Sequence, residues 1–131
     1  MQNEPRTPVR VLLVADSRDE REMYAESLRQ EGFCTLQASS ATDAYRLASE
    51  LTPQVVVTGL KLAGQADGLA LARQLKATET TRALPVVVLS GYASQRYRDA
   101  ASEAGCDLFL VKPCLPAELV ETIARLVAHP A

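Results

Sequence analysis

Chemically useful side chains in this sequence stand where apolar runs end. Asp16, Ser90 and Lys112 each lie at the end of a separate apolar run. A carboxylate, a hydroxyl and an ammonium group supply the charge and the hydrogen bonds with which proteins hold small ions. A further run, Pro53–Thr58, ends at Gly59, which has no side chain to contribute. Whether these residues act together depends on whether the runs are neighbouring strands of one sheet.

The apolar runs have the character of buried parallel strands. Val55–Val57 are three consecutive β-branched residues with no polar alternation, which is typical of a strand covered on both faces. Between the runs, apolar residues recur at helical spacing among charged ones. We expect strands at 9–14, 33–38, 53–58, 85–90 and 108–111, and helices at 18–31, 41–51, 67–77, 94–104 and 116–128.

This alternation predicts an α/β fold. Five strands that alternate with five helices over short connections indicate a parallel sheet with helices on both faces. Right-handed crossovers favour the flavodoxin-like, doubly wound strand order 2-1-3-4-5. In such a sheet ligands bind at the carboxyl ends of the strands, so we expect the residues that end the strands to meet there. These residues are Ala15, Asp16, Gly59, Ser90 and Lys112.

Each helix is expected to bury one apolar stripe. By their spacing, Met23 in the first helix, Leu51 in the second and Tyr97 in the fourth fall on these stripes. The three cysteines are widely spaced and odd in number, which fits neither a disulfide framework nor a metal motif. We expect them to be small apolar fillers in a reducing compartment. They are Cys34, Cys106 and Cys114.

Length and charge limit the classes of protein. At 131 residues the chain is long enough for one core, and we divide it into a flexible lead-in at 1–8, a domain at 9–128 and a tail at 129–131. The 14 basic and 16 acidic residues leave a net charge of −2 without a basic block, so direct nucleic-acid binding is not expected. No apolar run is long enough to cross a membrane or to form a signal peptide, which favours a cytoplasmic location.

Together, the strand ends resemble those of the receiver domain of two-component response regulators. The resemblance covers nearly the whole chain. It rests on the acid after the first strand, on Asp67-Gly68 after a glycine-containing loop, on Ser90, and on the string AGCDLFLVKP at Ala104–Pro113. Lys112-Pro113 is a weak signal alone, but it is strong at the end of the fifth strand of a correctly ordered chain. The resemblance implies a bacterial signalling module and not an enzyme.

The family's chemistry lies at the strand ends. An aspartate after the third strand takes a phosphoryl group from a phosphohistidine on a kinase, and this aspartate and two acids after the first strand hold Mg²⁺. A Ser or Thr and a Lys then hold the phosphoryl oxygens. The resemblance assigns Asp16 to the second acid and Ser90 and Lys112 to the last two roles. It places Phe109 at an aromatic switch position.

Two carboxylates of the family pattern are missing from this sequence. Gly59 stands six residues after Pro53, where the resemblance places the acceptor aspartate, and Ala15 stands at the first acid. Thr58 is no substitute, because neighbouring strand residues point to opposite faces. A single carboxylate is a poor site for a hard cation, so we expect no cofactor and lost or very weak Mg²⁺ binding.

The retained residues also have structural interpretations. Asp16 can be a turn or cap residue, and for Ser90 we favour a hydrogen-bonding role at its strand end. If Lys112 points inward it needs an anion, which leads to the hypothesis of an Asp16–Lys112 pair across the pocket. Leu115 stands where a helix usually has a capping Asp, Ser or Thr. Either Leu115 packs locally, which we favour, or it extends an apolar surface that a partner uses.

The leading functional hypothesis is an atypical receiver that acts without phosphorylation. We expect it to bind a kinase, another regulator, an output domain or a second copy of itself through the face of the fourth helix, fifth strand and fifth helix. Any output then comes from a partner or from a longer chain. The alternative is a small-molecule or anion sensor, in which Lys112, Ser90 and Lys61 surround the vacated pocket. A nucleotide-binding enzyme is disfavoured, because 15–18 contains no glycine-rich phosphate loop.

Overall fold

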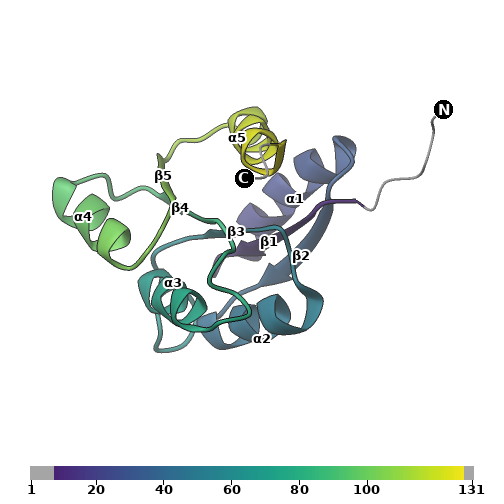
Figure 1. The fold of residues 1–131 in the computed structure, drawn as a ribbon. Coiled ribbons are helices and arrows are strands. Elements are labelled where there is room, and N and C mark those ends of the chain that lie inside the picture. The colour runs from purple at the N-terminus through teal and green to yellow at the C-terminus, as the bar shows by residue number, and fades with distance from the viewer. Residues whose placement is uncertain (1–7, 129–131) are drawn as a thin grey trace.

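The computed structural model describes residues 8–128, which form a parallel sheet between two layers of helices (Figure 1). The sheet has the order β2-β1-β3-β4-β5, which confirms the predicted topology. Most of the predicted lead-in, residues 1–7, and the predicted tail at 129–131 lie outside the described residues. The strands are β1 (Arg10–Val14), β2 (Cys34–Ala38), β3 (Val55–Thr58), β4 (Val86–Ser90) and β5 (Leu108–Val111). The helices are α1 (Arg18–Gln30), α2 (Ala41–Leu51), α3 (Gly68–Ala77), α4 (Gln95–Glu103) and α5 (Pro116–Ala128).

The strand register brings the carboxyl ends of four strands to one edge. Val14 of β1 is aligned with Thr58 of β3, and Thr58 is aligned with Val88 of β4. Ser90, the last residue of β4, is aligned with Val111 of β5. The loops that follow these strands therefore leave the sheet side by side.

Apolar side chains on the two faces of the sheet form two cores. Every residue of β3 and β4 is buried, which confirms that the valine runs are central strands. Figure 1 shows α1 and α5 on one face of the sheet and α2 and α3 on the other. The first core contains Leu28 of α1 and Ile123 of α5, and the second contains Leu71 and Leu75 of α3 with Ala101 of α4.

Side-chain caps fix where α1 and α3 begin, and Ser40 caps α2 in the same way. Ser17 Oγ accepts a hydrogen bond from the N–H of Glu20 at 3.1 Å, so Ser17, and not Asp16, caps α1. Asp67 Oδ1 accepts one from the N–H of Ala70 at 2.8 Å at the start of α3. Both caps lie at the edge of the sheet where the strands end, because each helix starts just after a strand or its loop.

Four side chains that the sequence predicts as buried are exposed. The exposed fractions of Met23, Leu51 and Tyr97 are 46%, 42% and 39%, and Cys34 is exposed on β2, at the edge of the sheet. Met23 lies one residue, or about 100° of helical turn, from the buried stripe of α1. Leu51 is the last residue of α2. Tyr97 belongs to α4, in which only Ala101 is buried.

Disulfides and membrane-spanning helices are both absent from residues 8–128. All three cysteines are free, and Cys106 and Cys114 are half-buried, in line with the predicted filler role. Burial raises the pKa of the Cys106 thiol to about 11. No helix in this part of the chain is long and apolar enough to cross a membrane.

Candidate functional site

A cavity of about 150 Å³ lies at the carboxyl edge of the sheet. All five residues that the sequence places at strand ends line it. The full lining consists of Ala15, Asp16, Glu20, Gly59, Leu60, Lys61, Ser90, Gly91, Tyr92 and Lys112. The structure thus brings a hydroxyl and two ammonium groups together with Asp16, and it adds an acid, Glu20, that the sequence analysis missed.

Gly59 leaves one wall of this cavity without a side chain. Its N–H donates to the carbonyl oxygen of Val14 at 2.9 Å, which continues the β1–β3 ladder. A Cβ built at Gly59 would lie 3.8 Å from its nearest neighbour, the carbonyl oxygen of Lys61, which is ordinary van der Waals contact. The backbone at this position therefore accepts a side chain, and glycine is not a steric requirement.

Gly68, at the start of α3, is required by packing. A Cβ there would lie 1.9 Å from the carbonyl oxygen of Gly59. The Gly68 N–H donates to the carbonyl oxygen of Leu60 at 2.8 Å, and the Thr58 hydroxyl donates to the carbonyl oxygen of Gly59 at 2.9 Å. Thr58 is buried on this side and does not line the cavity. These contacts fix the loop that follows β3.

Lys112 forms an ion pair with Glu20 of α1. The hypothesis of an Asp16–Lys112 pair is therefore wrong: Glu20 takes the lysine, and Asp16 has no ion pair among the described residues. The reason is the position of α1, whose first turn lies over the ends of the strands. Both partners are only partly buried, with side-chain exposed fractions of 37% for Lys112 and 23% for Glu20.

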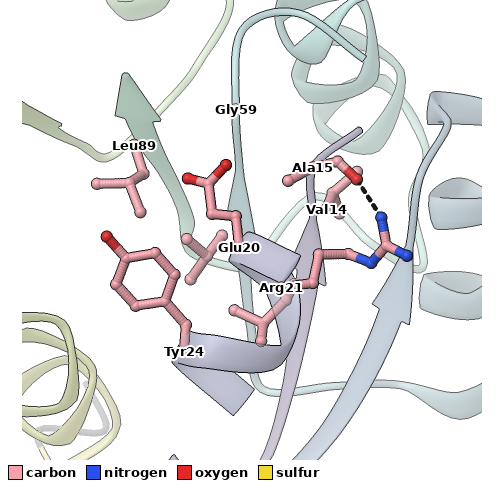
Figure 2. A pocket seen from close by; sticks show the side chains of 9 residues that line it. Val14, Ala15, Glu20, Arg21, Tyr24, Gly59 and Leu89 are labelled. Atoms are coloured by element: carbon pink, nitrogen blue, oxygen red, sulfur yellow. Dashed lines mark hydrogen bonds between the residues drawn. The ribbon is translucent and has the colours of Figure 1, made fainter. Parts of the chain in front are cut away.

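The Glu20 carboxylate also reaches a second, smaller cavity beside the first. Figure 2 shows it pointing away from α1, into the space between Leu89 and Ala15 and towards Gly59. This cavity has a volume of about 20 Å³, room for no more than about one water molecule. Arg21 Nη1 donates to the carbonyl oxygen of Ala15 at 2.6 Å, which fixes the start of α1 against the end of β1.

The helical pattern of α1 contains the signal that identifies Glu20. Glu20, Tyr24 and Leu28 are spaced four residues apart, so they share one face of the helix. Tyr24 and Leu28 are buried. A charged residue at the start of such a stripe points towards the sheet and must find a partner there.

Tyr24 supplies a second link to the connection between β5 and α5. Its hydroxyl donates to the carbonyl oxygen of Cys114 at 2.7 Å. Burial is the main cause that raises the pKa of Tyr24 to about 12, followed by negative charge at Cys114, Glu20 and Glu118. The hydroxyl therefore stays protonated and remains a hydrogen-bond donor at neutral pH.

Ser90 is buried and already hydrogen-bonded. Its Oγ accepts from the N–H of Tyr92 at 2.9 Å. This is the strand-end role favoured from the sequence, and it shapes the turn that leads from β4 towards α4. Lys61, by contrast, is exposed at the mouth of the cavity.

The donor set around the cavity fits a divalent cation poorly. Within residues 8–128, no group of three or more His, Cys, Asp or Glu side chains is placed to hold a metal ion. Asp16 and Glu20 line the cavity, but Glu20 is neutralised by Lys112. A single carboxylate without an ion pair, beside two ammonium groups, is a poor site for Mg²⁺. This ion is bound through carboxylate and other oxygen ligands and is repelled by the positive charges.

Phe109 lies on β5, outside the cavity. Its ring is half-buried against the core, and the guanidinium carbon of Arg98 lies 5.2 Å from the ring centroid. This contact joins α4 to the edge strand. Tyr92 and Tyr97 pack against each other with their ring centroids 5.3 Å apart and their planes tilted by 35°.

Leu115 is the most exposed large apolar residue described, with an exposed fraction of 63%. The favoured local packing of this side chain is therefore wrong. Glu118 supplies the half of a capping box that needs no polar side chain at residue 115: its Oε1 accepts from the Leu115 N–H at 2.9 Å. The Glu118 N–H in turn donates to the carbonyl oxygen of Leu115 at 2.9 Å. The Leu115 backbone takes part in these bonds, whereas its apolar side chain is exposed to solvent.

The doubly wound sheet, with a polar cavity at the strand ends, is of the flavodoxin-like class. The chain belongs to the response regulator receiver domain family, whose model matches residues 11–124. Members of this family are signalling modules that interact with kinases and output domains in two-component systems. The described fold, with five parallel strands in the order 2-1-3-4-5, is the one these modules share.

Several known proteins are similar to this chain. The transcriptional regulatory protein PrrA of Mycobacterium tuberculosis is 36% identical over 121 residues, covering 92% of this chain and 51% of PrrA. The phosphate regulon transcriptional regulatory protein PhoB of Pseudomonas aeruginosa is 32% identical over 118 residues, covering 90% and 50%. A putative response regulator from Chloroflexus aurantiacus superposes with a TM-score of 0.87 at 28% identity, covering 94% and 100%. The chain thus spans about half the length of the curated relatives it matches.

Proposed function

We propose that this chain is an atypical receiver, a pseudo-receiver, that works in two-component or phosphorelay signalling without accepting a phosphoryl group. The observation that carries this proposal is Gly59. It follows β3 at the edge of the cavity and offers no atom that can attack a phosphohistidine. Since a Cβ would fit there, the backbone at residue 59 can still carry a side chain, but the nucleophile that the family places at this position is missing.

The charges around the cavity support the same proposal. Phosphoryl transfer in this family depends on a divalent cation that neutralises the moving charge. Ala15 contributes no carboxylate, and Glu20 is committed to Lys112. We therefore propose that the chain works without Mg²⁺ and without any other cofactor.

The surface through which this receiver would act is the face of α4, β5 and α5. Large apolar side chains are exposed on or beside these elements, and each would gain from burial against a partner. They are Tyr92, Tyr97, Leu108 and Leu115. We propose that this face binds a kinase, another regulator, an output domain or a second copy of the chain.

The output of such a receiver lies outside the described domain. The two curated relatives are named as transcriptional regulators, and this chain matches about half of each. We propose that a partner, or the remainder of a longer protein, produces the response in the bacterial cytoplasm. The chain's net charge of −2 gives its receiver domain no basis for direct binding to nucleic acid or to an anionic membrane.

The proposal is tested by intact-mass measurement after incubation with acetyl phosphate and Mg²⁺. The natural chain is expected to gain no phosphoryl group. A matched variant carrying Ala15→Asp and Gly59→Asp restores both carboxylates on the same backbone. Phosphorylation of an aspartate in the natural chain would disprove the proposal, and phosphorylation of the variant alone would support it.

A second function, sensing of a small anion, is favoured by one observation. The cavity of about 150 Å³ is lined by Lys61 and Lys112. Against it, Lys112 already has a carboxylate and Ser90 already holds the turn at Tyr92. An anion would have to displace Glu20, so millimolar phosphate or sulfate is expected to leave the melting temperature unchanged. A saturable rise in melting temperature would favour the sensor.

A further inference from the structure

The anionic partner of Lys112 is Glu20 of α1, whereas the sequence suggests Asp16, which follows β1. β3 is followed by Gly59, which has no side chain, and β1 is followed by Ala15 and Asp16. Glu20 reaches the lysine from the first turn of α1. Its carboxylate also lines the small cavity beside Ala15 and Gly59, the space that larger side chains at those two positions would enter.

We propose that Glu20 replaces the missing strand-end carboxylates as the electrostatic partner of Lys112, and that this pair holds α1 against the connection between β5 and α5. The inference rests on the proposed function, because it assumes that no phosphoryl group ever claims the lysine. Glu20 acts as a positioning residue. It fixes the place of the Lys112 ammonium group and, through it, the path of the chain into α5.

The partial burial of both side chains gives the pair its role. An ammonium group shielded from water without an anion is costly, and so is a shielded carboxylate without a cation. Within the cavity lining, Asp16 is the other acid and Lys61 the other cation, and both are exposed to solvent. Glu20 and Lys112 therefore have more to gain from each other than from these neighbours.

A second contact joins the same two segments. One turn further along α1, the Tyr24 hydroxyl donates to the carbonyl oxygen of Cys114 at 2.7 Å. Residues four apart on α1 thus contact residues two apart in the connection, Lys112 and Cys114. Two links of this kind keep α1 and the connection from separating and also from rotating relative to each other. The connection is therefore held in one arrangement without a ligand.

A double-mutant cycle with Glu20→Gln and Lys112→Met measures the pair. The change in the unfolding equilibrium constant caused by Glu20→Gln is expected to be about three- to tenfold larger when Lys112 is present than when it is methionine. The matched control replaces Glu20→Gln by Asp16→Asn, which alters an acid on the same cavity and is expected to show no coupling. No coupling for Glu20, or stronger coupling for Asp16, would overturn the proposal.

Hydrogen exchange provides a readout that a purely local role would not change. Glu20→Gln is expected to speed amide exchange in residues 112–115, whereas Asp16→Asn leaves it unaltered. Equal exchange in both variants would overturn the link between α1 and the connection. The two proposals can fail separately, because coupling is read from unfolding and exchange, whereas phosphorylation is read from intact mass.

Discussion

At the scale of residues, two glycines beside the cavity differ in what the backbone demands of them. Gly68 is held within van der Waals distance of the carbonyl oxygen of Gly59, so its missing Cβ is a packing requirement. Gly59 has ordinary space around the point where a Cβ would be and no positive φ angle. One glycine therefore maintains the loop, and the other determines what chemistry the cavity contains.

Alanine substitution is expected to separate these two roles. Gly59→Ala should leave the free energy of unfolding unchanged or raise it by up to about 1 kcal/mol, because the unfolded chain loses conformational freedom. Gly68→Ala should lower it by about 2 kcal/mol or more, because the Cβ collides with backbone. Urea unfolding of the two variants beside the natural chain measures both. Equal losses in the two variants would contradict this assignment.

Cys106 is expected to weaken the fold in alkaline solution. Burial raises the pKa of its thiol from 9.0 to about 11, so the unfolded chain loses this proton at lower pH than the folded chain. The contribution of Cys106 to stability is complete below about pH 9 and falls as the pH rises towards 11. Unfolding free energies measured across this range should decline less in Cys106→Ala than in the natural chain.

Tyr24 serves as the internal comparison for that measurement. Its pKa is raised to about 12, mainly by burial, so it produces a similar decline that begins about one pH unit higher. The Cys106→Ala variant retains this later decline. If both curves were parallel from pH 9 to 11, the buried-thiol explanation would be wrong.

At the scale of elements, the helices differ greatly in how firmly they are attached. α1 buries Tyr24, Ala25 and Leu28 and is further tied to residues 112–114. α4 buries Ala101 alone and begins without a side-chain cap bond at Ser94. Its exposed side carries the aromatic ring of Tyr97, so a helix of the proposed interface is also the one least restrained by the core.

Amide hydrogen exchange is expected to follow this difference. Amides of α4 should exchange faster than those of α1, and those of β3 and β4 should exchange slowest, because opening the central strands requires both cores to separate. Exchange mass spectrometry resolved to short peptides measures the order. Protection of α4 equal to that of β4 would show that contacts beyond Ala101 secure the helix.

The sequence was sufficient for the elements, their order and the five strand-end residues of the cavity, because each depends on a local pattern. The three-valine runs marked the central strands β3 and β4, Ser90 marked the end of β4, and Lys112 marked the end of the edge strand β5. The Glu20–Lys112 pair was missed because it depends on where the first turn of α1 lies relative to the carboxyl ends of the strands. This position is set by tertiary packing and not by a local sequence pattern. Tyr97 was misplaced for a related reason: helical spacing identifies an apolar stripe but not how deeply the helix is packed.

At the scale of the whole molecule, the ion pair between Glu20 and Lys112 joins α1 to the connection that leads to α5, and both residues line the cavity. An aspartate introduced at residue 59 would place a new carboxylate near Glu20, with Lys112 as their shared cation. Like charges at short range oppose each other unless a metal ion neutralises them. Restoring the acceptor alone therefore does not restore the surroundings that phosphoryl transfer needs.

Removal of Glu20 is expected to assist recovery of phosphorylation. A variant with Ala15→Asp, Gly59→Asp and Glu20→Gln should be phosphorylated by acetyl phosphate and Mg²⁺ several-fold faster than the Ala15→Asp, Gly59→Asp variant. The reason is that Lys112 becomes available to the phosphoryl oxygens. Time-resolved intact-mass measurement compares the two rates. A slower triple variant would show that Glu20 assists the transfer and does not compete with it.

The pair between Glu20 and Lys112 also bears on how such a domain changes over generations. Once Glu20 of α1 is the partner of Lys112, an aspartate that arises at residue 59 finds this lysine already paired. An aspartate that arises at residue 15 adds negative charge without restoring function. Neither aspartate is useful until the other has been introduced and Lys112 has been released from Glu20. Under the proposed function, the pair would thus make the loss of phosphorylation hard to reverse by one-step mutation, and selection would then act on the exposed face of α4, β5 and α5.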